Sequence, residues 1–110
     1  YPPAIQEPAV LRIREKTLFL RGDSNADGRI NIADPVFILS YIFSAGLEPP
    51  CLSSADANDD EKINIADPVT ILGHIFSQTG PLPAPFGDCG EDPTEGELSC
   101  DSFPPCEEAR

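Results

Sequence analysis

The sequence contains an internal repeat with an offset of 33 residues, and no other feature constrains the fold as strongly. Residues 23–45 overlay residues 56–78 with identity at 15 of 23 positions. Each copy opens with a polar loop and continues into an apolar segment with helical spacing. The apolar positions are Val36, Leu39, Ile42 and Phe43 in the first copy and Val69, Leu72, Ile75 and Phe76 in the second. We therefore expect two similar loop–helix units.

The ends of both helices are marked in the sequence. Pro35 and Pro68 fall where a proline in the first helical turn costs little, because the N–H that it lacks has no partner there. Gly46 and Gly80 precede further prolines and are typical of a helix end. We expect the helices to stop at these two glycines.

Both loops carry oxygen-bearing side chains on alternate residues, which is the pattern of a calcium-binding loop. Calcium prefers about six to eight oxygen ligands, and a loop of this kind adds the backbone carbonyl of its seventh residue. The predicted ligands are Asp23, Asn25, Asp27, the Arg29 carbonyl, Asn31 and Asp34, and, in the second loop, Asp56, Asn58, Asp60, the Lys62 carbonyl, Asn64 and Asp67. Magnesium retains its water more strongly, and transition metals favour nitrogen or sulfur. We expect two Ca²⁺ sites.

The two loops differ at their sixth position. Gly28 fills it in the first loop, whereas Glu61 fills it in the second, where a side chain is strained by positive φ. The second site is thus expected to bind calcium more weakly, or its loop to be distorted. At the eighth position, Ile30 and Ile63 are expected to pack together while the loops exchange short strand hydrogen bonds.

Length and charge exclude several classes of protein. The chain has 110 residues, enough for one small domain, and a formal charge of −12. That charge disfavours nucleic acid and anionic membranes as partners. The sequence has no apolar run long enough to span a bilayer. We expect divalent cations and protein surfaces to be the partners.

The four cysteines predict a disulfide framework. Cys51, Cys89, Cys100 and Cys106 form no C-x-x-C pair, and a small acidic chain with an even number of cysteines fits a secreted, extracellular protein. Three pairings are possible. We favour Cys51 with Cys89, which would clamp the second unit, and Cys100 with Cys106, which would close a short loop.

The two flanks differ from the repeat. Residues 1–18 form a basic arm, and alternating apolar and basic residues predict a strand over about 9–20. Residues 81–110 are acidic and rich in proline, glycine and cysteine. The expected fold is mainly α: a calcium-binding domain at 19–80, an added N-terminal β-strand, and an irregular C-terminal tail that disulfides tie to the domain.

Segment 19–80 resembles a dockerin domain, the calcium-binding docking module of secreted bacterial proteins. The resemblance rests on the pattern D-x-N-x-D-G-x-I-N-x-x-D at 23–34, on Asp rather than Glu at its twelfth position, and on the lead-in Phe19–Asp23. It implies paired half EF-hands that lack an incoming helix. It also implies a cohesin partner bound through loop positions 10 and 11, which are Ile32 and Ala33, and Ile65 and Ala66.

Two functions of different kinds follow, and neither is enzymatic, because the acidic residues belong to the loops and the single histidine, His74, has no evident partner in sequence. One is docking of a secreted enzyme onto a cohesin-bearing scaffold. The other, which the sequence favours, is a structural module that associates with copies of itself in an extracellular fibre or surface layer. Its basic strand, with Arg12, Ile13 and Arg14, would then add to a sheet edge of the next copy.

Overall fold

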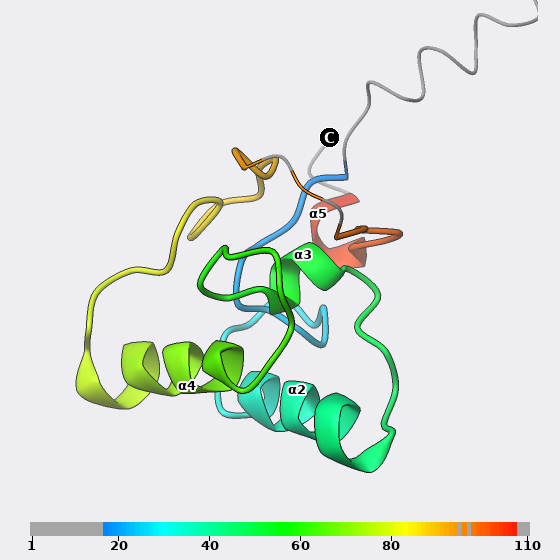
Figure 1. Ribbon diagram of the computed structural model, residues 1–110. Helices are drawn as coiled ribbons and strands as arrows, with labels where there is room; N and C mark the ends of the chain where they lie inside the picture. Colours follow the sequence, from blue (N-terminus) through cyan, green and yellow to red (C-terminus); the bar gives the residue numbers. More distant parts are fainter. Residues whose placement is uncertain (1–16, 95, 97, 108–110) are drawn as a thin grey trace, which may run out of the picture.

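The computed structural model describes residues 17–94, 96 and 98–107, and within them the chain is mainly helical (Figure 1). Its elements are α2 (Ala33–Ser44), α3 (Leu52–Ala55), α4 (Ala66–Leu72), the π-helical segment η1 (Gly73–Ser77) and α5 (Pro104–Glu107). None of these helices is long and apolar enough to cross a membrane. Most of the strand predicted over 9–20, with Arg12, Ile13 and Arg14, lies outside the described residues.

The two long helices lie side by side and enclose the first core (Figure 1). Ile38 of α2 and Ile71 of α4 are fully buried there, and Ile30 and Ile63 of the two loops pack against them. Among the apolar helix positions named above, Val36, Phe43, Val69 and Phe76 are all more than half exposed. Of these helix positions, Ile42 and Ile75 pack against this core.

The helical segments end shortly before the predicted glycines: α2 ends at Ser44, before Gly46, and η1, which continues α4, ends at Ser77, before Gly80. Ala45 and Gln78 take the left-handed conformation, with φ of 55° and 51°. The N–H of Gly46 then donates to the carbonyl of Ser40 at 2.9 Å, which satisfies a carbonyl of the last helical turn. The predicted stop is confirmed, but a residue with a side chain performs the left-handed turn.

A second core joins the start of the repeat to the C-terminal tail. Phe19 and Phe103 are buried in it with both disulfides around them. The favoured cysteine pairing is wrong, because the bonds join Cys51 to Cys100 and Cys89 to Cys106. Two isolated β-bridges, Phe19 with Gly90 and Cys51 with Cys100, bring distant segments together in this region. The tail is therefore folded onto the domain by apolar burial as well as by its disulfides.

Candidate metal centre

The first loop wraps its backbone around two carboxylates. Asp23 accepts hydrogen bonds from the N–H groups of Asp27, at 3.2 Å, and Gly28, at 2.8 Å. Asp34, at the start of α2, accepts from Asn31 at 2.9 Å and from Asn25 at 3.5 Å. One carboxylate oxygen from each of Asp23, Asp27 and Asp34 lies within 4.8 Å of the others. Three carboxylates thus converge on one point.

The second loop reproduces this geometry. Asp56 accepts from the N–H groups of Asp60, at 3.2 Å, and Glu61, at 2.8 Å, and Asp67 accepts from Asn64 at 3.0 Å. The carboxylates of Asp56, Asp60 and Asp67 converge as in the first loop. Glu61 does adopt positive φ, 67° against 88° for Gly28, yet its N–H bond is unchanged. The loop is therefore not distorted, and a difference in calcium affinity stays a prediction.

Burial makes these carboxylates costly to ionise without a cation. The carboxylates at the first and twelfth loop positions are fully buried, and burial is the largest cause of their raised pKa values. From an ordinary 3.8, the pKa rises to about 7 for Asp34 and Asp56 and to about 6 for Asp23 and Asp67. Repulsion between neighbouring carboxylates adds to the rise. A divalent cation among them would reverse both effects.

The third loop position supplies an independent sign of a ligand. The Oδ1 atoms of Asn25 and Asn58 are buried and accept no hydrogen bond. A buried carbonyl oxygen without a donor is costly, since it has lost its water and gained nothing. Both loops leave the same atom unpaired, and a cation bound by the carboxylates would satisfy it. The residues present therefore fit a metal ion with oxygen ligands.

The remaining predicted ligands lie at the rim of the loops. Asn31 and Asn64 each use Oδ1 to accept the N–H two residues ahead, at 3.0 Å, which fixes the turn that leads into α2 and α4. Arg29 and Lys62 have exposed side chains, and their N–H groups donate to the aspartate two residues before them. The backbone hydrogen bonds expected between Ile30 and Ile63 are not found among the described residues.

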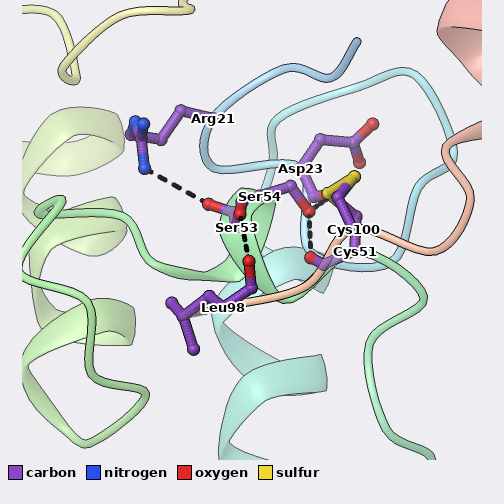
Figure 2. Close-up of a disulfide and its surroundings, with 7 residues drawn as sticks. All are labelled: Arg21, Asp23, Cys51, Ser53, Ser54, Leu98 and Cys100. Carbon is purple, nitrogen blue, oxygen red and sulfur yellow. Dashed lines mark hydrogen bonds between the residues drawn. A yellow bond between two sulfur atoms is a disulfide. The ribbon is translucent and has the colours of Figure 1, made fainter. Parts of the chain in front are cut away.

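Two residues that sequence reasoning did not assign to the site brace the loops crosswise. Arg21 donates from Nη1 to the carbonyl of Asp56 at 2.8 Å, and Ser54 donates from Oγ to the carbonyl of Asp23 at 3.1 Å. Figure 2 shows Ser54 next to the Cys51–Cys100 disulfide and Arg21 farther from it, with its guanidinium toward Ser53. Arg21 and Ser54 occupy the same position of the repeat, two residues before each loop. Each therefore holds the first residue of the opposite loop.

The predicted partner-binding residues that lie within the described part of the chain are at the protein surface. Ile32 and Ile65 are half exposed at the starts of the two helices, with Ala33 and Ala66 next to them. Further large apolar side chains are exposed along the chain that follows: Val36, Phe43 and Leu47 after the first loop, and Val69 and Phe76 after the second. The two copies of the repeat thus present matching apolar surfaces.

Comparison of the chain with protein-family models, curated proteins and solved structures finds no match.

Proposed function

We propose that the chain is a dockerin-like module that binds two calcium ions and uses the ordered helices to hold a protein partner. The observation that carries the calcium proposal is the unpaired, buried Oδ1 of Asn25 and of Asn58. Each lies in a loop that also brings three carboxylates together. The two loops repeat this arrangement independently, which supports two sites of one kind.

The chemistry of the donors favours calcium over other cations. All donors in the loops are carboxylate, amide or backbone oxygens, which suit a hard cation. Ligands on opposite sides of an ion at about 2.4 Å lie about 4.8 Å apart, and the carboxylate oxygens of Asp23, Asp27 and Asp34 fall within that span. Magnesium would need a stricter octahedron and would keep several waters.

Calcium would supply charge compensation and would fix both loops against the core. Asp34 and Asp67 belong to the first turns of α2 and α4, so an ion held by them ties each loop to its helix. The two disulfides indicate an oxidising environment such as the extracellular space. We propose that the module is secreted, where free calcium is abundant.

Calcium titration of the full chain tests this proposal. We expect two ions per chain by calorimetry and by native mass spectrometry. Asp27→Ala should lower the melting temperature in calcium and have little effect in EGTA, because Asp27 is exposed and contributes mainly as a ligand. Asp88→Asn, at an exposed position in the tail, is the control for lost charge. Equal losses in calcium and in EGTA would contradict a metal role for Asp27.

The exposed apolar side chains on α2, α4 and η1 support a docking function. Phe43 and Phe76 are about two-thirds exposed at matching positions of the two copies, and exposed apolar surface of this kind is typical of protein interfaces. We propose a cohesin-like partner for this face. Capture of a purified cohesin in calcium, lost with Val36→Asp and Val69→Asp together, would support docking. Unchanged capture by that variant would contradict it.

Self-association into an extracellular filament is the second candidate. It is favoured by the charge distribution, with a basic N-terminal arm on a chain of charge −12. Light scattering and negative-stain images of the full chain, with calcium and with EGTA, test it. A monomer at all concentrations in both conditions would exclude self-assembly and would leave docking as the proposed function.

A further inference from the structure

The C-terminal segment makes polar contact with the second metal loop. The Thr94 hydroxyl donates to Oδ2 of Asp59 at 2.6 Å, and Gly96 packs so closely on the Glu61 carboxylate that a Cβ would collide with it. At the first loop, by contrast, the contact is between Pro105 and Gly28, where a Cβ would meet Pro105 at an ordinary 3.8 Å. The two loops are alike internally, but the tail contacts them in different ways.

Arg21 connects the tail to the backbone of the second loop. Its side chain is fully buried and donates to the carbonyls of Asp56, at 2.8 Å, and Ser53, at 3.2 Å. On the tail side it donates to Asp92 Oδ1 at 3.0 Å and to the carbonyl of Ala84 at 3.0 Å. One guanidinium thus holds the first residue of the second loop and two points of the tail.

The charge of this guanidinium must be compensated because it is buried. Asp92 compensates it from the tail through a hydrogen-bonded ion pair, and Asp59 of the second loop lies at 3.6 Å from the same nitrogen. If Asp92 were neutral, the positive charge would act on Asp59 and on the cation site that follows it. The loop would then be drawn toward Arg21, and its affinity for a cation would fall.

We propose that Arg21 is a positioning residue for the second calcium loop, although it precedes the first loop in sequence, and that the tail sets the affinity of the second loop through Asp92. This inference rests on the calcium binding proposed above. It predicts that a change in the tail alters one site and spares the other. Comparison of the two copies of the repeat singles out Arg21 in the sequence, because it occupies the position that Ser54 has in the second copy.

The test measures calcium binding to one loop at a time in the full, disulfide-bonded chain. Asp34→Ala disables the first loop and reports on the second, and Asp67→Ala does the reverse. Asp92→Asn is added to each background, with Asp88→Asn as the control of equal charge. By calorimetry we expect Asp92→Asn to weaken the second loop about tenfold, as for other outer partners of metal ligands, and the first loop less than about twofold.

Two further variants separate positioning from general stability. Asp92→Glu keeps the charge and should restore most of the affinity, and Thr94→Val removes the contact with Asp59 and should weaken the second loop alone. Arg21 is left in place, because its removal would leave buried carbonyls without donors.

Three outcomes would overturn the inference. These are equal weakening of both loops, weakening of the first loop alone, and a lower melting temperature in EGTA with unchanged calcium affinity. If neither background binds calcium even with Asp88→Asn or with no tail change, the proposed calcium function itself fails, and the inference fails with it.

Discussion

Replacing Asp34 with asparagine should change stability in opposite directions with and without calcium. The carboxylate is fully buried, and its pKa rises from 3.8 to about 7. At about 1.4 kcal/mol per pKa unit, ionising it above pH 7 without a cation costs about 4 kcal/mol. Asparagine removes that cost but can accept at one oxygen only, and so gives up a backbone hydrogen bond of about 1 kcal/mol.

Loop relaxation and water entry further reduce the stability that Asp34→Asn gains, so we expect a stabilisation of about 2 kcal/mol in EGTA. In calcium at a thousandfold excess over the dissociation constant, a site contributes about 4 kcal/mol, and the variant loses it at the first loop. The net result in calcium is a loss of about 2 kcal/mol.

Urea denaturation at pH 8, in calcium and in EGTA, measures both free energies of unfolding. Asp88→Asn removes the same charge from an exposed position and should give small changes in both conditions. The reasoning would be refuted if Asp34→Asn destabilised the protein in EGTA, because burial of an unpaired carboxylate would then not be the cost that calcium offsets.

Three other predictions follow from the loops and the tail. Folding raises the pKa of four buried loop aspartates, so the folded chain binds more protons than the unfolded chain between about pH 4 and 7. The free energy of unfolding in EGTA, measured by urea melts, should therefore rise as pH falls from 8 to about 5. Calcium affinity should fall over the same range, because protons compete for the carboxylates. Glu61→Gly should raise stability in EGTA by about 1 kcal/mol and strengthen the second site, since Glu61 has φ of 67° and an unpaired buried Oε2. A loss of stability as large as that caused by Gly28→Ala would contradict this prediction. Joint replacement of Cys51 and Cys100 by serine should cost about 4 kcal/mol, because their bond joins residues at a sequence separation of 49. A loss under about 1 kcal/mol in urea melts would show that the tail is held by other contacts.

The repeat predicts the two loop–helix units, but it does not identify which helix face is buried. Residues 36–39 and 41–43 are all apolar or aromatic, so a helical period fits several faces equally well. The structure buries Ile38 and Ile71, because these positions face each other across α2 and α4. The packing of the two helices against each other determines which face is buried, and the sequence of one helix alone does not indicate that face.

The cysteine pairing is missed for a related reason. Proximity in sequence favours Cys100 with Cys106, whereas the chain joins Cys51 to Cys100 over a separation of 49 residues. Burial of Phe19 with Phe103 brings the tail back to the start of the repeat, and this contact between distant residues sets the pairing. In contrast, the loop carboxylates were predictable, since their spacing alone brings them together.

Arg21 shows where a difference between two otherwise equal sites can arise. The predicted side-chain ligands of the two loops are the same residue types, and the backbone hydrogen bonds that Asp23 and Asp56 accept agree to within 0.1 Å. The residue two positions before each loop differs, however. The short neutral side chain of Ser54 binds the first loop, and the long charged side chain of Arg21 binds the second. Only the charged brace requires a counter-ion, and Asp92 of the tail provides one. If the loops bind calcium as proposed, the duplicated unit would acquire unequal sites through the groups that support the loops, while the side-chain ligands stay unchanged.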